Sequence, residues 1–335
     1  IRVMTPIGEG SWRQSLLVGA PAVGTVDVSA IDADIGDALW MTTTDFLTPT
    51  TLSMVEIGQQ PQKLKSMPAF FKADGLATEQ QFATSKDGTK VPYFIVRPTF
   101  LPLDGSTPTL LWGYGGFEVS YTAAYNSMAG RGWLQQGGVF VLANIRGGGE
   151  YGPRWHQAAL KANRHKAYED FAAVAEDLFA REITSPARLG AQGGSNGGLL
   201  MGNMVVQYPQ LFGAIVCQVP LLDMKRYSHL LAGASWMAEY GDPDTRDWEF
   251  IKTFSPYHLL KEGVEYPPVL FTTSTRDDRV HPGHARKMMA KMEAMNADVR
   301  YYENIEGGHG GAANNQQEAH MRALAYTFLW QQLRK

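Results

Sequence analysis

The chain has 335 residues, of which 44% are hydrophobic and 19% charged, and its formal net charge is −3. This composition is typical of a soluble globular protein with a sizeable core, in one large domain or about two. It offers no broad basic field for nucleic acid or an anionic membrane, and no apolar run reaches the roughly 18 residues of a membrane span.

Cys217 is the only cysteine, so no internal disulfide can form, and its apolar neighbours predict a buried, unreactive thiol. The chain begins at Ile1, without an initiator Met or a signal peptide, as a processed chain or a fragment would. We therefore leave the compartment of this soluble protein open between cytoplasm and periplasm.

The first 75 residues are predicted to be β-rich. Strand-like runs lie at 15–18, 24–28, 38–44 and 52–57. About four short strands make one blade of a β-propeller, and a propeller needs roughly four to eight blades to close. Residues 1–75 therefore cannot form a complete propeller, and we expect a small antiparallel sheet or the tail of something larger.

From residue 76 onward, strands and helices alternate. The expected strands flank the turn at Asp87-Gly88 and then lie at 109–112, 139–144, 211–219, 269–273 and 299–302. Apolar residues at helical spacing predict helices around 168–178, 285–295 and 324–329, and we assign the methionines of the second helix to core packing. The alternation predicts an α/β fold with a doubly wound, mostly parallel sheet over residues 76–335.

A Gly-x-Ser-x-Gly pattern stands at Gly193, Ser195 and Gly197. A short apolar run precedes it and a helical apolar pattern follows it, which is the strand–turn–helix context of a nucleophile elbow. So tight a turn strains the serine backbone and excludes bulky neighbours, which explains the glycines. A phosphate-binding loop is the alternative, but no Lys-Ser/Thr pair follows the glycines.

A serine nucleophile needs a base, and the base needs an orienting acid. In α/β-hydrolases these follow in the chain order serine, acid, histidine. Asp277-Asp278 follows the expected strand 269–273, and His309 stands among four glycines after the strand 299–302. Both loops follow carboxyl ends of strands, where sites in open α/β sheets form.

The same part of the sequence is compatible with two other kinds of site. His281 and His284 have the spacing of metal ligands, but no third ligand is apparent, so we expect no metal and no cofactor. Asp277 and Asp278 could form a paired-carboxylate site, but adjacent residues of an extended loop point apart.

Residues from about 78 to 335 resemble the catalytic domain of prolyl oligopeptidases, serine peptidases that cleave after proline, and residues 30–58 resemble the last part of that family's propeller. Six motifs carry the resemblance, in the expected order: Gly113-Tyr114-Gly115-Gly116-Phe117, Asn144-Ile145-Arg146-Gly147-Gly148-Gly149-Glu150-Tyr151-Gly152, Gly193-Gly194-Ser195-Asn196-Gly197-Gly198, Trp236-Met237-Ala238-Glu239-Tyr240-Gly241, Asp277-Asp278-Arg279-Val280 and Gly307-Gly308-His309-Gly310. The resemblance makes residues 76–335 an α/β-hydrolase catalytic domain.

The resemblance implies a catalytic role for five of these residues. Ser195 would attack the carbonyl carbon, His309 would take and return the proton, and Asp277 would be the acid of the triad. The Tyr114 hydroxyl and the Asn196 N–H would form the oxyanion hole.

The resemblance also implies a proline pocket walled by Phe117, Trp236 and Tyr240, with Leu221 in an aliphatic position. Aromatic faces suit a flat, rigid, apolar ring. Arg279 would hold a substrate carbonyl, for which its fixed donors are suited; the alternative is a salt bridge to Asp278.

We therefore expect a serine peptidase that hydrolyses bonds on the carboxyl side of proline in oligopeptides through an acyl-enzyme. The alternatives are a related oligopeptidase or aminopeptidase of other specificity, a carboxylesterase on the same fold, and a non-catalytic binding module. The expected partners are proline-containing peptides and a missing propeller portion, from the same protein or a companion chain. Neither nucleic acid nor a membrane is expected as a partner.

Overall fold

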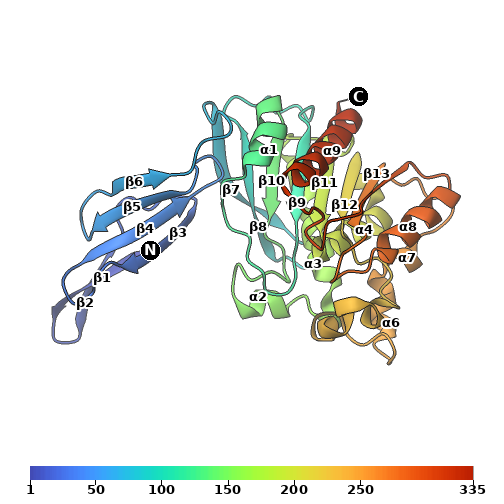
Figure 1. Cartoon of the computed structure of the whole chain (residues 1–335), viewed down its shortest axis with the longest axis horizontal. Helices are drawn as coiled ribbons and strands as arrows, with labels where there is room; N and C mark the ends of the chain where they lie inside the picture. The colour runs from blue at the N-terminus through green and yellow to red at the C-terminus, as the bar shows by residue number, and fades with distance from the viewer. Residues whose placement is uncertain (335) are drawn as a thin grey trace.

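A computed structural model describes residues 1–334 of the chain, and Figure 1 shows a slender β extension beside a larger α/β body. The extension holds two antiparallel sheets. One is the hairpin of β1 (Arg2–Gly8) and β2 (Ser11–Leu16), and the other has the consecutive order β3 (Thr25–Ala30), β4 (Ala38–Thr44), β5 (Thr51–Glu56) and β6 (Gln62–Ser66).

The small core of the extension consists of Leu17, Met41 and Val55. The runs predicted at 24–28, 38–44 and 52–57 correspond to strands of the four-stranded sheet. The predicted bounds of the strand at 15–18 were wrong. The strand ends at Leu16, and the buried Leu17 already belongs to the following turn.

The α/β body is built on one eight-stranded sheet with the order β14-β13-β12-β11-β9-β10-β8-β7. Its strands are β7 (Leu76–Thr84), β8 (Lys90–Pro98), β9 (Thr109–Gly113), β10 (Val139–Ala143), β11 (Leu189–Gly194), β12 (Ala214–Gln218), β13 (Val269–Ser274) and β14 (Val299–Asn304). β8 pairs antiparallel with β7 and β10, and the remaining pairs are parallel. The prediction of a mostly parallel sheet is confirmed.

The expected strand that precedes β13 in the chain begins later than predicted. The run 211–219 was expected to be extended throughout, but Pro209–Leu211 forms a 3-10 turn and β12 covers only Ala214–Gln218. Pro209 favours the first position of such a turn because it lacks an N–H and its φ is fixed. Leu211 is buried although it lies in this turn, so an apolar residue here did not mean that the chain is extended.

Helices cover both faces of the sheet. They are α1 (Ser127–Gly132), α2 (Pro153–Gln157), α3 (His165–Ala180), α4 (Asn196–Gln207), α5 (Met237–Tyr240), α6 (Trp248–Ile251), α7 (Pro256–Leu259), α8 (Gly283–Ala294) and α9 (Asn315–Leu333). In β10, Val139, Val141 and Ala143 face the core under α3, α4 and α8, whereas Phe140 and Leu142 face α1 and α9. Successive strand residues point to opposite faces, so the sheet is doubly wound.

The extension joins the body through aromatic and hydroxyl contacts. Thr25 Oγ1 donates to the carbonyl of Ala123 at 2.9 Å, and the rings of Phe71 and Tyr125 stack with centroids 5.0 Å apart. Phe46 packs against Phe94 and Phe140 on the α1 side of the sheet. Within residues 1–334, no helix is long and apolar enough to cross a membrane.

Candidate active site

Ser195 occupies the sharp turn between β11 and α4. Its φ of 60° and ψ of −116° lie in a region that non-glycine residues rarely adopt. A Cβ at Gly193 would lie 2.5 Å from the carbonyl oxygen of Gly197, and one at Gly197 would lie 2.7 Å from that of Gly113. The two glycines are therefore required for the serine to stand between strand and helix.

Ser195, His309 and Asp277 come together in one hydrogen-bonded row. His309 Nε2 lies 3.0 Å from Ser195 Oγ, and His309 Nδ1 lies 2.8 Å from Asp277 Oδ2. Ser195 and His309 are partly exposed, whereas the Asp277 side chain is fully buried. With the proton on Nδ1 facing the carboxylate, Nε2 can accept the serine proton.

The loop after β13 orients Asp277. Its Oδ1 accepts the backbone N–H groups of Arg279 and Val280, each at 2.9 Å, so the carboxylate is held toward His309. Asp278 is exposed to solvent. One carboxylate is buried against His309 and the other is exposed, which argues against a paired-carboxylate site.

Tyr114 and Asn196 lie beside this row. Asn196 is the first residue of α4, where backbone N–H groups lack partners within the helix. Burial raises the pKa of Tyr114, although the nearby charges of Arg279 and Arg164 and a hydrogen bond with Ser195 oppose the rise. The phenol therefore stays protonated at neutral pH and can donate a hydrogen bond.

The residues expected to form the proline pocket are partly brought together. The rings of Phe117 and Tyr240 meet edge to face, with centroids 5.6 Å apart. Leu221 and Trp236 are buried in the core cluster against which Phe117 packs. Arg279 is exposed and makes no ion pair in the described chain, so the alternative of a salt bridge to Asp278 does not hold there.

Sequence reasoning missed a polar network beneath the Tyr114 loop. Arg164 and Glu239 are buried there as a pair, and His156 Nε2 lies 2.7 Å from Glu239. In the sequence, His156 has no distinguishing pattern around it, and Arg164 stands in a run of polar residues that is typical of a solvated surface. Of these three residues, only Glu239 lies in one of the six family motifs, so only its position suggested a role near the site.

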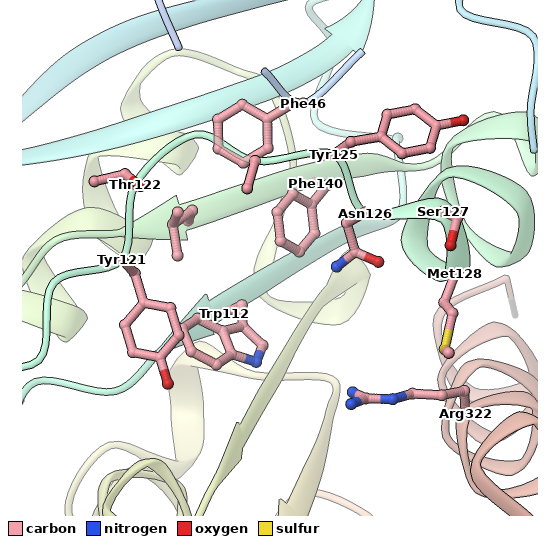
Figure 2. A pocket seen from close by; sticks show the side chains of 12 residues that line it. Phe46, Trp112, Tyr121, Thr122, Tyr125, Asn126, Ser127, Met128, Phe140 and Arg322 are labelled. Carbon is pink, nitrogen blue, oxygen red and sulfur yellow. The ribbon is translucent and has the colours of Figure 1, made fainter. Parts of the chain in front are cut away.

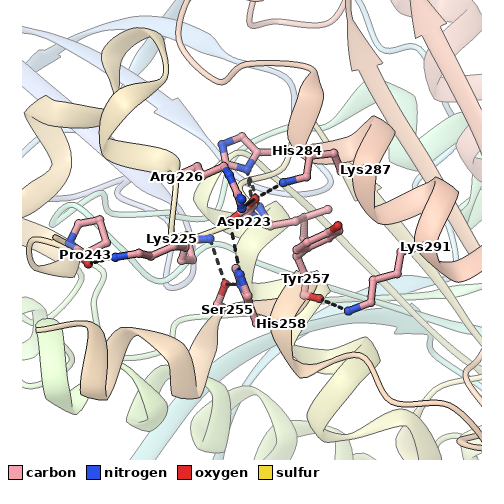
Figure 3. A network of polar contacts seen from close by, with 12 residues as sticks. Asp223, Lys225, Arg226, Pro243, Ser255, Tyr257, His258, His284, Lys287 and Lys291 are labelled. Carbon is pink, nitrogen blue, oxygen red and sulfur yellow. Dashed lines mark hydrogen bonds and ion pairs between the residues drawn. The ribbon is translucent and has the colours of Figure 1, made fainter.

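A second Ser/His/Asp grouping lies elsewhere in the body, and Figure 3 shows it around Asp223. Ser255 Oγ lies 2.8 Å from His258 Nδ1, and His258 Nε2 lies 3.9 Å from Asp223 Oδ1. Ser255 is fully buried, and its oxygen accepts the N–H of Met224 at 3.0 Å. A substrate could not reach this hydroxyl, so the grouping is structural.

The cavity in Figure 2 has a volume of about 390 Å³ and lies between the extension and the α1 side of the body. Phe46, Trp112, Phe140 and Arg322 are among its lining residues. None of the expected site residues lines it. The hydrogen-bonded serine, and not this cavity, therefore locates the candidate site.

Other reactive side chains have structural surroundings. Burial raises the pKa of the Cys217 thiol, which agrees with the predicted inert cysteine. His284 Nδ1 accepts the N–H groups of Leu222 and Asp223 at 3.3 and 3.0 Å, so it is used in packing. The described residues contain no group of three side chains able to hold a metal ion.

The doubly wound sheet and the serine at a strained strand–helix turn, hydrogen-bonded to a histidine, define the α/β-hydrolase class. Within that class the chain belongs to the prolyl oligopeptidase family, whose profile matches residues 125–335.

Comparison with individual proteins gives the same family. The chain is 50% identical over 328 residues to an uncharacterized peptidase of Sinorhizobium fredii, across 97% of this chain and 45% of that protein. It is 36% identical over 285 residues to the prolyl endopeptidase of Elizabethkingia miricola, across 83% and 40%. The structure of a post-proline cleaving enzyme from Rickettsia typhi is 37% identical, has a TM-score of 0.87 and covers 99% of this chain. The chain spans less than half the length of these relatives.

Proposed function

We propose that the chain carries the active site of a serine peptidase that hydrolyses peptide bonds on the carboxyl side of proline in oligopeptides. The observation that carries the proposal is the row Ser195–His309–Asp277, with hydrogen-bond distances of 3.0 and 2.8 Å. A serine hydroxyl is a weak nucleophile until an adjacent base can remove its proton, and this geometry supplies the base.

The proposed reaction has two stages. Ser195 Oγ attacks the carbonyl carbon while its proton passes to His309 Nε2, and the oxyanion receives hydrogen bonds from the Tyr114 hydroxyl and the Asn196 N–H. The C–N bond then breaks, His309 donates the proton to the leaving amine, and an ester of Ser195 remains. Water attacks that ester with His309 as base, and the acid product and Ser195 are released. Asp277 holds the imidazole and stabilises its protonated form.

Specificity for proline is proposed from the pocket residues. Phe117 and Tyr240 form an edge-to-face pair, and Trp236 and Leu221 supply apolar surface to the same cluster. Such walls suit a pyrrolidine ring, while Arg279 could hold a neighbouring carbonyl. The names of the relatives, a prolyl endopeptidase and a post-proline cleaving enzyme, agree with this specificity.

A preference for basic residues is less well supported, although one acidic group does lie near the pocket. That group is Glu239, and its carboxylate is not available to a substrate cation because Arg164 and His156 both contact it. A lysine or arginine side chain would therefore find this carboxylate already paired.

We also propose that residues 76–335 form the catalytic domain and residues 1–75 a partial propeller. The four-stranded sheet leaves β3 and β6 as edges. Unpaired strand edges favour pairing with other strands. The remaining blades of a propeller, from the same protein or a companion chain, would provide the strands that cover these edges.

The proposed function is tested with a panel of chromogenic substrates that carry Pro, Ala, Lys or Phe before the leaving group. We expect hydrolysis to be fastest with Pro, and a fluorophosphonate to label the chain but not its Ser195→Ala variant. A faster Lys or Phe substrate would reject the proline specificity. Failure of both hydrolysis and labelling would reject the enzyme itself.

A further inference from the structure

Arg164 and Glu239 form a buried ion pair directly beneath the loop that carries Tyr114 and Phe117. Arg164 is 1% exposed and Glu239 is 4% exposed, and Arg164 Nη1 lies 3.0 Å from Glu239 Oε1. They come from different parts of the chain, Arg164 from just before α3 and Glu239 from α5. A buried charge pair is weak evidence for stability on its own, so its other contacts decide what it does.

The pair holds the loop through several backbone groups. Glu239 Oε1 accepts the N–H of Phe117 at 2.9 Å, and Arg164 Nη2 donates to the carbonyl of Gly115 at 2.7 Å. Arg164 Nη2 also donates to Asn196 Oδ1 at 2.5 Å, and Asn196 Nδ2 donates to the carbonyl of Tyr114 at 2.6 Å. Residues 114, 115 and 117 are therefore all fixed from below by one connected set of side chains.

The loop needs such support because its backbone is strained. Phe117 and Glu118 both have a φ of 57°, in the left-handed region that bulky residues rarely adopt. Strained conformations persist only where surrounding contacts specify them, and they cluster at functional sites. The hydrogen bond from Phe117 N–H to Glu239 lies at this strained position.

The same side chains reach the expected pocket wall. The Tyr240 hydroxyl donates to Asn196 Oδ1 at 2.7 Å, and the guanidinium carbon of Arg164 lies 5.4 Å from the centre of the Tyr240 ring. Tyr240 in turn contacts the ring of Phe117. The ion pair therefore connects the pocket wall to the loop that presents the Tyr114 hydroxyl.

We propose that Arg164 and Glu239 are positioning residues, which act through Tyr114 and Phe117 to set the oxyanion donor and one pocket wall relative to Ser195. The inference rests on the proposed function. A donor in an oxyanion hole acts only where it matches the developing charge, so a displacement of about 1 Å can cost roughly 100-fold in rate.

The test uses two variants of the full chain. The double substitution Arg164→Met with Glu239→Gln removes both charges together and so leaves no buried charge unpaired. Arg164→Lys keeps the charge, but a single ammonium cannot reproduce the forked contacts to Gly115, Asn196 and Glu239. On a prolyl anilide we expect kcat to fall roughly 100-fold in the double variant and about tenfold in Arg164→Lys. The ratio of kcat/KM for Pro over Ala substrates should fall in both.

Both variants are then measured again in the Tyr114→Phe background. If the pair acts through the Tyr114 hydroxyl, the further loss in kcat should shrink to about threefold or less, because residues that act through one another are not additive. Equal losses in both backgrounds would overturn the inference. So would an unchanged kcat in Arg164→Lys, which tests the inference even if the double variant does not fold.

A matched control is the pair Arg146 and Asp170, which is also buried, with Arg146 Nη2 2.6 Å from Asp170 Oδ1. The Arg146 side chain contacts Asp170, Asp87 and Ser85 and makes no hydrogen bond to residues 113–118. The double substitution Arg146→Met with Asp170→Asn should change the thermal midpoint of unfolding. It should not change the factor by which Tyr114→Phe lowers kcat. The same kcat loss in this control would mean general loosening and would overturn the inference.

Labelling separates the two levels of the proposal. A fluorophosphonate should label Ser195 in the unaltered chain and, more slowly, in the variants. An unlabelled, inactive chain would overturn the proposed function and the inference with it. A labelled, proline-selective chain whose variants keep full kcat and selectivity would overturn the inference alone.

Discussion

His284 should make the fold sensitive to acid. It is 2% exposed, and its Nδ1 accepts the N–H groups of Asp223 and Leu222 (Figure 3). Burial lowers its pKa to about 4, with the neighbouring His281 and Lys287 acting in the same direction and Asp223 and Asp277 opposing. The neutral ring is needed as an acceptor, so protonation would break both backbone hydrogen bonds.

The size of the effect follows from linkage. Between pH 6.5 and about 4 the unfolded chain binds a proton at this histidine that the folded chain does not, so unfolding becomes more favourable as pH falls. At 1.36 kcal/mol per pKa unit, the loss in the free energy of unfolding is about 3 kcal/mol near pH 4. Above pH 6.5 the group contributes no pH dependence.

The test is the substitution His284→Asn. The asparagine amide oxygen can lie near the position of Nδ1 and accept the same N–H groups, and the amide does not titrate in this range. Urea unfolding followed by circular dichroism at pH 7, 6, 5 and 4 gives the free energy of unfolding of each protein. We expect the unaltered chain to lose about 3 kcal/mol more than the variant between pH 7 and 4. His320→Asn, at an exposed histidine, should show no such difference. Parallel pH curves for the unaltered chain and His284→Asn would show that His284 does not cause the acid sensitivity.

Four further outcomes are expected at the site. Ser195→Ala should lower kcat on a prolyl anilide by about 10⁶ with an unchanged circular dichroism spectrum, and substantial residual turnover would contradict the assignment. Tyr114→Phe should lower kcat by roughly 10²–10³ with a modest change in KM, whereas an effect confined to KM would mean that the tyrosine only packs against substrate. Because burial raises the pKa of Tyr114, kcat should not fall between pH 8 and about 10 through ionisation of its phenol. A loss there that Tyr114→Phe abolishes would count against this. Trp236→Ala should reduce the preference for Pro over Ala by about fivefold, since an aromatic contact contributes roughly 1 kcal/mol beyond its buried area. An unchanged preference would mean that Trp236 does not contact the proline ring.

Some features of the fold are local in the sequence and could be predicted from it. The helical face of α3, from Tyr168 to Leu178, is buried as its spacing predicts. The elbow was readable because Gly193, Ser195 and Gly197 must be close in sequence to make the turn. The expected order of nucleophile, acid and base also pointed to the residues that the structure brings within hydrogen-bonding distance.

Choices between neighbouring residues needed the tertiary structure. The sequence by itself left Asp277 and Asp278 as equal candidates, and the resemblance alone favoured the first. In the structure, two backbone N–H groups turn Asp277 toward His309, and Asp278 faces solvent. Likewise, Leu211 was apolar enough for a strand, but the proline before it begins a turn.

The alternation of strands and helices, the strained serine turn and the order of the candidate triad could all be predicted from the sequence, since they depend on periodicity and on short motifs. Only the tertiary structure placed Arg164 against Glu239, 75 positions away, beneath the Tyr114 loop. A charged side chain in a polar stretch carries no local sign of burial. Its environment is set by segments that meet only when the sheet and helices have packed. The contact of Arg164 with Glu239 beneath the site therefore could not be predicted from the sequence.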